Sequence, residues 1–249
     1  MTYSIGLAGK GGTGKTTLSC LLVKFIVEKG KTPVLAVDAD ANSNLNEVLG
    51  CEIEETLGDA REEMMKSVSS GMTKDVYMEM KLQQAVIERT GFDLIVMGRP
   101  EGAGCYCAAN SLLTVYLEKL IDNYNFVVID NEAGMEHISR LTTNNIDTLL
   151  VVSDPTRRGI QAAARIVELT GELSLNISRK LLIVNRTKEL KRDAVEQAVK
   201  DFGLNLIGMV PEDPEVQEFD LNGRPTIELS KENSAVKAAY EIFQKIFPE

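Results

Sequence analysis

The residues best able to do chemistry lie close to the N-terminus, in the segment GKGGTGKTT from Gly9 to Thr17. Glycines let consecutive backbone N–H groups converge on an anion, and the N-terminus of a following helix adds positive potential. In this pattern Lys15 would reach the β- and γ-phosphates, and the Thr16 hydroxyl would bind Mg²⁺. The rest of the phosphate cradle would come from Gly11, Gly12, Thr13, Gly14 and Thr17. The segment therefore predicts a nucleoside triphosphate site.

Two later segments supply carboxylates that suit the same chemistry. Asp38 and Asp40 follow the apolar run Pro33–Val37, and Asp130 follows the apolar run Phe126–Ile129. An aspartate directly after a buried strand commonly ties to the Mg²⁺ shell of a nucleotide. We therefore expect Asp130 to belong to the magnesium site, and Asp38 to emerge beside it. A loop whose Asp40 and Asn42 or Ser43 only cap a helix is the plainer alternative.

The elements that must position these residues follow a strand–helix alternation along the chain. Several apolar runs are continuous Val/Ile/Leu stretches, which is typical of a parallel sheet covered on both faces. We therefore expect an α/β fold with a mostly parallel central sheet, forming a single domain over residues 1–249. The expected strands are Tyr3–Ala8, Pro33–Val37, Phe92–Met97, Phe126–Ile129, Thr148–Val152, Lys180–Asn185 and Leu206–Val210. The expected helices are one beginning near Leu18, Ile160–Leu173, Asp193–Phe202, Ala235–Phe247 and further helix within Cys51–Arg89.

Composition limits the possible partners and the setting of the protein. Lys and Arg total 27 against 37 Asp and Glu, which gives a formal net charge of −10. This balance argues against a general nucleic-acid binder, since such a protein needs a basic face. We find no apolar run near the roughly twenty residues of a membrane-spanning helix, and we expect no signal peptide. The 4 cysteines show no disulfide spacing, so we expect a cytoplasmic protein with free thiols.

A second lysine in the glycine loop indicates which class of nucleotide-binding protein the sequence resembles. The stretch KGGTGKT, with Lys10 ahead of Lys15, resembles the deviant Walker A motif of the MinD/ParA/nitrogenase-iron-protein class of P-loop ATPases. The resemblance implies a homodimer in which Lys10 reaches the nucleotide of the facing subunit. It also implies that Asp38 holds Mg²⁺-linked water and Asp40 orients the attacking water, with the two roles exchangeable. Gly134, after Asp130, would sense the γ-phosphate.

The same resemblance suggests where the base binds. Asn185 and Arg186 match the family position that hydrogen-bonds adenine, and Pro211 and Asp213 match a P-x-D loop that closes over the base. Neither segment has the N-K-x-D form expected for guanine, so the sequence favours ATP over GTP. The single histidine, His137, is more typical of a structural residue than of a catalytic one.

A pair of cysteines separated by one residue points to a metal. Cys105 and Cys107 lie in the glycine-rich stretch GRPEGAGCYC, and their spacing disfavours a disulfide between them. Two thiolates can bind one soft or borderline metal ion, and a twofold dimer would bring four thiolates together. Two loop cysteines without a ligand remain the plainer alternative. Cys20 and Cys51 are isolated and are expected to pack in the core.

Two segments, RPEGAGCYC beginning at Arg99 and DNEAGMEH beginning at Asp130, resemble those of the CooC-type ATPases. The resemblance extends over nearly the full chain, from the glycine loop to the P-x-D loop. These are accessory proteins for nickel insertion into carbon monoxide dehydrogenase, with a branch serving acetyl-CoA synthase. The resemblance implies a metal-bridged homodimer, with Cys105 and Cys107 as ligands, whose nucleotide state controls nickel binding and release. The sequence does not separate nickel from zinc, nor one client enzyme from the other.

Two other functions stay open on sequence grounds. An electron-transfer ATPase like the nitrogenase iron protein would hold an iron–sulfur cluster, but its second cluster cysteine corresponds here to His137. A partition or positioning ATPase would act without metal chemistry. The acidic balance opposes DNA binding, and the expected last helix lacks the Lys/Arg-rich face of a membrane anchor.

Overall fold

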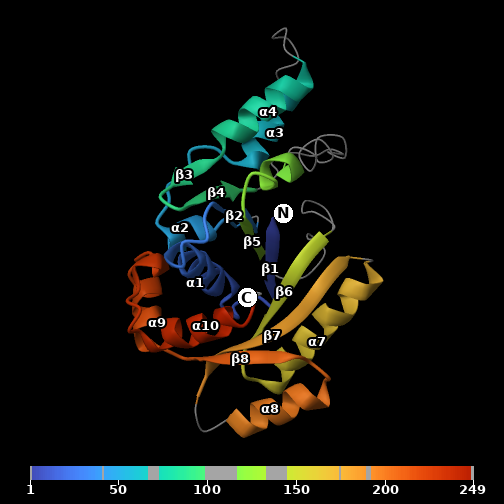
Figure 1. Cartoon of the computed structure of the whole chain (residues 1–249), viewed down its shortest axis with the longest axis vertical. Coiled ribbons are helices and arrows are strands. Elements are labelled where there is room, and N and C mark those ends of the chain that lie inside the picture. Colours follow the sequence, from blue (N-terminus) through green and yellow to red (C-terminus); the bar gives the residue numbers. More distant parts are fainter. Residues whose placement is uncertain are drawn as a thin grey trace.

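The fold is built on one eight-stranded sheet with helices on both faces (Figure 1). The computed structural model describes residues 2–40, 42–66, 73–98, 117–132, 145–173, 175–188 and 192–247. Within them the strand order is β3-β4-β2-β5-β1-β6-β7-β8. The strands are β1 (Tyr3–Gly9), β2 (Val34–Ala39), β3 (Ile87–Arg89), β4 (Phe92–Val96), β5 (Phe126–Asn131), β6 (Asn145–Ser153), β7 (Asn176–Thr187) and β8 (Leu206–Pro211). The expected α/β fold with a mostly parallel sheet is confirmed.

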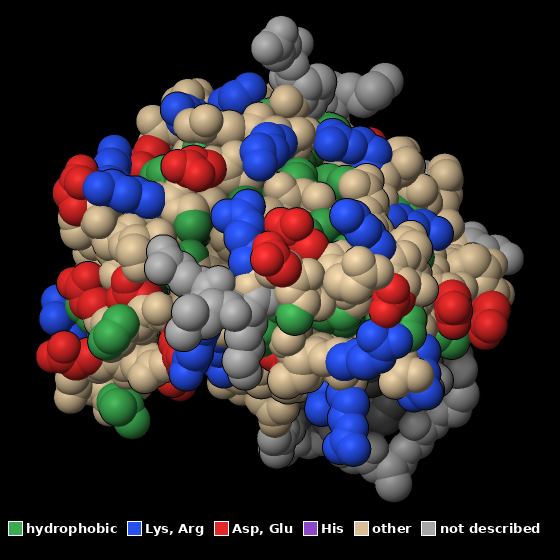
Figure 2. All heavy atoms as spheres, turned by 90° about the horizontal axis from the view of Figure 1, so that it is seen from below, with side chains coloured by type: hydrophobic (Ala, Val, Ile, Leu, Met, Phe, Trp, Pro, Cys, Tyr) green, Lys and Arg blue, Asp and Glu red, His purple; other side chains and the backbone are tan. Residues whose placement is uncertain are grey.

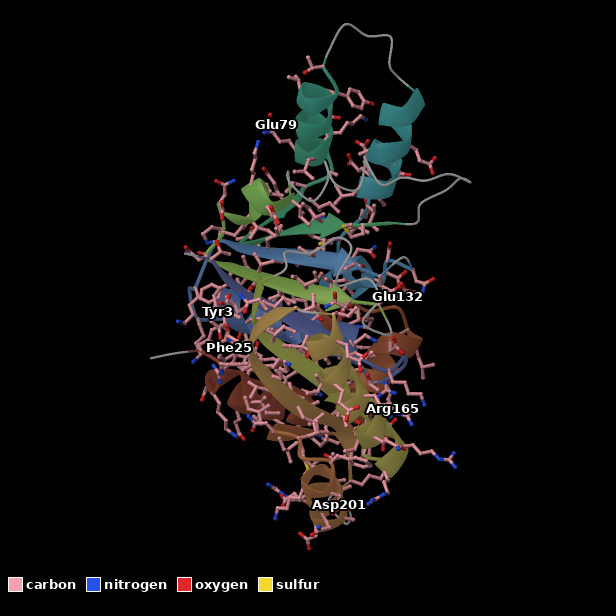
Figure 3. All side chains as sticks on the ribbon, turned by 90° about the vertical axis from the view of Figure 1, so that its right-hand side faces the viewer. Tyr3, Phe25, Glu79, Glu132, Arg165 and Asp201 are labelled. Atoms are coloured by element: carbon pink, nitrogen blue, oxygen red, sulfur yellow. The ribbon has the colours of Figure 1, made fainter. Side chains whose placement is uncertain are left out.

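The pairing register brings the polar residues of different strands to one edge. All pairings are parallel except that of β3 with β4. Asp38 of β2 lies opposite Asp130 of β5, and Leu7 of β1 lies opposite the same Asp130. Figure 3 shows Tyr3 at one end of the strands and Glu132, just after β5, at the other. The predicted catalytic carboxylates therefore share the carboxyl edge of the sheet, where open α/β sheets bind ligands.

Helices cover both faces of the sheet because most inner strands are apolar on both sides. On one face α1 (Lys15–Glu28) packs with α10 (Ser234–Gln244), and Phe25 stacks on Phe247 with ring centroids 5.8 Å apart. On the other face α7 (Arg157–Glu172) and α8 (Arg192–Asp201) cover β6 and β7. The remaining helices are α2 (Leu45–Leu49), α3 (Leu57–Lys66), α4 (Lys74–Gln84) and α9 (Pro214–Leu221). In Figure 1, α3 and α4 project beyond the β3 edge of the sheet.

Alternate residues of one strand enter different parts of the core. In β2, Val34 and Ala36 face the layer formed by α1 and α10, whereas Leu35 and Val37 face the opposite layer. All four are 0 % exposed. Burial of this kind contributes about 1.5–3 kcal/mol per large aliphatic side chain before the entropy of ordering is counted. Both isolated cysteines, Cys20 and Cys51, are buried in the first layer, as expected.

Three local features differ from the expectations drawn from the sequence or add to them. The region Cys51–Arg89 contains the expected helix, in α3 and α4, but it ends in the antiparallel edge strand β3. Helix α9 was not among the expected helices, and it begins at Pro214 after Asp213. The N-terminal cap of α2 is Asn44 rather than Asn42 or Ser43.

The surface of the described residues carries mixed charge. On the face shown in Figure 2, Lys and Arg side chains are interspersed with Asp and Glu instead of gathering into one basic patch. In the part of the chain that the structure describes, no helix is both long and apolar enough to span a bilayer.

Candidate nucleotide site

The glycine loop connects β1 to α1 and has the backbone geometry of an anion cradle. Gly12 and Gly14 have φ values of 77° and 90°, a left-handed region that favours glycine. At Gly9 a Cβ atom would lie 2.3 Å from the carbonyl oxygen of Val152 in the neighbouring strand. The loop therefore needs glycine for backbone conformation and for close approach to β6. Its last glycine is the N-cap of α1, so the first N–H groups of that helix are free for an anion.

The two loop lysines differ in their surroundings. Lys10 is exposed, and its carbonyl oxygen accepts hydrogen bonds from Thr13 Oγ1 at 2.9 Å and Lys15 Nζ at 3.5 Å. Lys15 is only 7 % exposed. Burial lowers the pKa of Lys15, while the carboxylates of Asp130, Asp40 and Glu132 act in the opposite direction. The contact between the Lys15 ammonium and a phosphate stays a prediction, and the position of Lys15 at the start of α1 is compatible with it.

Two buried carboxylates lie opposite each other at the ends of β2 and β5. Asp130 is 2 % exposed and accepts hydrogen bonds from Ser19 Oγ at 3.0 Å and from the Thr16 hydroxyl. Asp38 is 0 % exposed, and its two oxygens accept the backbone N–H groups of Asp40 and Leu45 at 3.0 and 2.9 Å. Asp38 therefore holds the loop after β2 against the start of α2. Carboxylate and hydroxyl oxygens are the ligands that Mg²⁺ prefers, so this set fits the ion.

The buried carboxyl groups are hard to ionise in the free protein. Burial raises the pKa of Asp38 to about 7, against the backbone hydrogen bonds from Leu45 and Asp40 that lower it. Burial likewise raises the pKa of Asp130 to about 6, although Thr16, Ser19 and Lys15 oppose the shift. The charge of Asp40 also raises the pKa of both groups, and that of Asp130 raises the pKa of Asp38, because like charges repel. A divalent cation would relieve that repulsion, which is a further reason why the site suits magnesium.

Asp40 has a different environment from Asp38. It is half-buried, and its Oδ1 accepts the backbone N–H of Asn42 at 2.8 Å, which forms a local turn. Its charge also acts on Lys15. Asp40 thus lies in the field of the phosphate-binding lysine while keeping contact with solvent. The roles predicted for Asp38 and Asp40, at the magnesium-bound water and the attacking water, stay predictions, and the two remain exchangeable.

The end of β7 reaches the glycine loop from the other side. Asn185 Nδ2 donates to the Thr13 carbonyl oxygen at 2.9 Å, and an Arg186 guanidinium nitrogen donates to the Gly12 carbonyl oxygen at 3.0 Å. Asn185 is 7 % exposed, whereas Arg186 is exposed. The Asn185 amide also lies so close to Gly14 that a Cβ there would be 2.3 Å from Nδ2. Both residues predicted for base binding therefore contact the phosphate loop.

A cavity of about 130 Å³ lies next to these residues and can take the base. Its lining includes all four residues predicted for the base. The residues around it are Thr17, Leu18, Leu21, Asn185, Arg186, Val210, Pro211, Glu212, Asp213, Val216, Gln217, Asp220, Thr226 and Ala235. Apolar side chains and a larger number of polar ones line the cavity, so it can offer both a flat apolar contact and hydrogen bonds to a base.

Asp213 holds a helix end in this cavity wall. Its Oδ1 accepts the backbone N–H groups of Glu215 and Val216 and the Asn233 side-chain amide at 2.9, 3.3 and 2.9 Å. Partial burial alone would raise the pKa of Asp213, but hydrogen bonds from Ser234, Asn233 and the two backbone groups lower it. Asp213 therefore fixes the position of the loop that faces the base, and a contact between its carboxylate and the base would compete with these bonds.

Comparison with known protein families identifies the family of this chain. Residues 5–227 match the model of the CobQ/CobB/MinD/ParA nucleotide binding domain. The chain belongs to this family. It is an ATPase, in agreement with the phosphate loop, the buried carboxylates and the base cavity.

Relatives in the MinD/ParA family have different stated roles. An uncharacterized ATP-binding protein of Methanocaldococcus jannaschii is 43 % identical over 247 residues, covering 97 % of each chain. The carbon monoxide dehydrogenase accessory protein CooC of Rhodospirillum rubrum is 29 % identical over 91 % of this chain and 90 % of its own. The septum site-determining protein MinD of Bacillus subtilis is 28 % identical over 97 % of this chain and 87 % of its own.

Solved structures of the family share the fold along the whole chain. MinD of Pyrococcus furiosus superimposes with a TM-score of 0.74 at 23 % identity, covering 99 % of this chain and 98 % of its own. MinD of Pyrococcus horikoshii, solved with Mg-ADP, gives a TM-score of 0.73 at 23 % identity, with 99 % and 96 % covered. These likenesses establish the fold.

Several predicted residues lie outside the described part of the chain. Gly134, His137 and the cysteine pair Cys105 and Cys107 are among them. Among the residues that are described, no group of three or more His, Cys, Asp or Glu side chains could hold a metal ion. The thiolate site therefore remains a prediction from sequence.

Sequence reasoning missed two residues that organise this MinD/ParA-type site. Ser19 lies one helical turn after Thr16 and hydrogen-bonds to Asp130, so the 3.6-residue period of α1 could have revealed it. Asn131 is 2 % exposed, and its Nδ2 donates to the Leu7 carbonyl oxygen at 2.8 Å. That bond ties the end of β5 to β1 just before the phosphate loop, and the sequence pattern gives no signal for it.

Proposed function

We propose that this ATPase is a metallochaperone, in which two copies of the chain share one nickel ion and release it under the control of ATP. The ion is cargo, bound by Cys105 and Cys107 of each copy. The client is a nickel enzyme, carbon monoxide dehydrogenase or acetyl-CoA synthase. The observation that carries the proposal is a pair of cysteines one residue apart in a chain whose remaining site residues are those of an ATPase.

Hydrogen bonds at the end of β4 support a link between the nucleotide site and the proposed metal site. The Met97 N–H donates to the Asp38 carbonyl oxygen at 2.9 Å, and the Met97 carbonyl oxygen accepts the Gly58 N–H at 2.8 Å. Gly98 has a φ of 67°, and a Cβ there would lie 2.6 Å from the Cβ of Thr56. The segment that carries the cysteines therefore starts from a fixed point that is hydrogen-bonded to Asp38.

This contact offers a physical route from nucleotide to metal. When Asp38 and Asp40 adjust to the phosphates and magnesium, the end of β2 moves with them, and the exit from β4 is bonded to β2. Lys10 is exposed and free to reach a facing subunit, so closure of two copies and the geometry of the thiolates would change together. The likeness to CooC over 91 % of this chain supports the nickel assignment, whereas the MinD relatives support the ATPase alone.

Metal content per chain is the decisive measurement. Purified protein is loaded with nickel anaerobically with ADP, with a non-hydrolysable ATP analogue, or without nucleotide, and the bound metal is quantified. We expect half an ion per chain in a dimer, with a different affinity in each nucleotide state. Cys105→Ser and Cys107→Ser should each abolish binding, while Cys51→Ala, which removes a buried thiol 5 % exposed, should leave it unchanged.

Three results would contradict the proposal. One is a full ion per chain in a monomer, which would remove the shared site. Another is normal nickel activation of the client enzyme by the double Cys105→Ser/Cys107→Ser variant. The third is bound iron with visible absorbance after anaerobic purification, which would favour an electron-transfer ATPase instead.

A further inference from the structure

Arg186 has an unusual backbone conformation at the point where β7 meets the phosphate loop. Its φ is +58°, and among the described residues only Ser43 is another non-glycine with positive φ. An arginine in the left-handed region is strained relative to glycine, by about 1 kcal/mol or more. The conformation directs the guanidinium towards Gly12, where it donates to the carbonyl oxygen at 3.0 Å. A strained residue with a defined hydrogen bond at a functional site suggests a role in that site.

The bond from Arg186 belongs to a set that engages the carbonyl groups of the phosphate loop. Asn185 donates to the Thr13 carbonyl oxygen at 2.9 Å, and Thr13 Oγ1 donates to the Lys10 carbonyl oxygen at 2.9 Å. Three of the four carbonyl groups from Lys10 to Thr13 are therefore held by side chains. In a planar peptide group the N–H points away from the carbonyl, so these bonds fix the directions of the N–H groups that follow. The Thr13 N–H donates to the Lys10 carbonyl oxygen at 3.4 Å, which closes the turn of the loop around the anion position.

We propose that Arg186 is a positioning residue for the polyphosphate of the nucleotide, acting through the Gly12 peptide group and not on the base. Gly12 has a φ of 77° and open space where a Cβ would lie, so no side-chain packing of its own fixes its conformation. The N–H of the same peptide, that of Thr13, donates within the loop to the Lys10 carbonyl oxygen at 3.4 Å, so the bond from Arg186 at 3.0 Å is the shorter of the two that fix this peptide group. The proposal rests on the ATPase activity alone and is independent of the metal cargo.

Three substitutions separate the hydrogen bond from the backbone strain. Arg186→Gly removes the guanidinium and relieves the positive φ, so the nucleotide-free protein should melt at or above the wild-type temperature. Arg186→Gln removes the guanidinium but keeps the strain. Arg186→Lys keeps one donor, which is enough for one carbonyl. Arg192→Gln is the matched control, because Arg192 is 73 % exposed and pairs only with Glu196 in the described structure.

The experiment measures dissociation constants for MgADP and for magnesium tripolyphosphate, which lacks a base, by displacement of a fluorescent ADP analogue. We expect Arg186→Gly and Arg186→Gln to weaken both ligands by the same factor, about tenfold for one charge-assisted hydrogen bond. Arg186→Lys should recover most of the loss, and Arg192→Gln should match the wild type. The KM for ATP should rise with little change in kcat, because the loop binds phosphate in the ground state as well.

Each other outcome overturns the proposal. Weaker MgADP binding with unchanged tripolyphosphate binding would place Arg186 on the base. Unchanged affinity for both ligands in Arg186→Gly would leave the bond to Gly12 without a role in binding. An affinity loss that follows the melting temperature, large in Arg186→Gln and absent in Arg186→Gly, would make Arg186 a residue that serves only the stability of the fold.

Discussion

The buried carboxyl group of Asp130 lowers the free energy of unfolding at neutral pH. Its pKa is raised by burial from 3.8 to about 6, so the folded protein holds a proton that the unfolded chain releases. Such a group destabilises the fold as the pH rises from about 4 to about 6, and the full penalty is present above that range. Asp38, whose pKa is raised by burial to about 7, adds a penalty of the same sign that extends to about pH 7.

We therefore expect Asp130→Asn to stabilise the nucleotide-free protein while abolishing ATP hydrolysis. In EDTA at pH 8 the gain in unfolding free energy should be about 1–3 kcal/mol, because a neutral amide replaces a buried charge. At pH 4 the gain should vanish, since the folded wild-type carboxyl is then protonated. Urea denaturation at both pH values checks this, and a variant less stable than wild type at pH 8 would show that Asp130 is well solvated or paired.

The two lysines of the loop should differ in the property that each controls. Lys15→Ala leaves three carboxylates around an empty position, so we expect ATP turnover to fall by on the order of 10²-fold or more. Lys10→Ala removes an exposed side chain, so MgADP should bind the single chain with nearly wild-type affinity while the ATP-dependent dimer is lost. Steady-state turnover together with sedimentation velocity separates the two effects. Equal loss of MgADP binding in both variants would contradict a cross-subunit role for Lys10.

Helices α9 and α10 begin at one shared cluster, and this cluster supports the wall of the base cavity. Asp213 caps α9, and Asn233 caps α10 by accepting the Ala235 and Val236 N–H groups while its amide donates to Asp213. We expect Asp213→Ala to lower the unfolding free energy by about 1–2 kcal/mol, since it removes the cap of α9 and one of the two acceptors of the Asn233 amide, which keeps Glu215. MgADP binding should weaken as well.

A helix N-cap far from the nucleotide site provides the control for Asp213→Ala. Thr73 caps α4, where its side chain accepts the Val76 N–H, and α4 lies beyond the β3 edge of the sheet. Thr73→Ala should destabilise the protein by about 0.5–1 kcal/mol without altering MgADP affinity. Chemical denaturation and calorimetric titration measure both quantities. If Asp213→Ala loses stability but binds MgADP normally, the loop that begins α9 does not shape the base cavity.

At the scale of the elements, the sequence predicts the strands that are buried inside the sheet. It misses the strand that is defined only by its pairing at the edge of the sheet. The inner strands were predictable because residues buried on both faces leave continuous apolar runs, as at Val127–Ile129. Strand β3 has three residues, two of them exposed, so it carries no such pattern. Helix α9 buries only Phe219, and its signal was the cap Asp213 followed by Pro214, a start motif that the P-x-D interpretation obscured.

The candidate site was predictable in its residues but not in their contacts. Lys15 and Thr16 were predicted from the spacing of the glycine loop, and Asp38 and Asp130 from their position directly after apolar strands. All four belong to patterns of residues that are adjacent in the sequence. The bond from Arg186 to Gly12 joins residues 174 positions apart, and no local pattern encodes it. The same holds for the contact between Asn131 and Leu7, which depends on strand order in the assembled sheet.

At the scale of the whole molecule, net charge opposes the proposed dimer. Each chain carries a formal charge of −10, so two copies repel one another as they approach. By Coulomb's law, two charges of −10 whose centres lie about 40 Å apart in water repel by about 10 kcal/mol before salt screens them. The screening length falls from about 30 Å at 0.01 M salt to about 8 Å at 0.15 M. Contacts buried inside an interface, such as Lys10 at a facing nucleotide, are screened much less.

We therefore expect the ATP-dependent dimer to tighten as salt is raised from about 0.01 to 0.15 M, by about tenfold in its dissociation constant. An interface built mainly on exposed ion pairs would show the opposite trend. The measurement is sedimentation equilibrium of a hydrolysis-deficient variant such as Asp40→Asn, saturated with MgATP at each salt concentration. Lys10→Gln in the same background is the control, and it should stay monomeric at every concentration. Weakening of the Asp40→Asn dimer by salt would mean that surface ion pairs, and not the shared nucleotides, hold the two copies together.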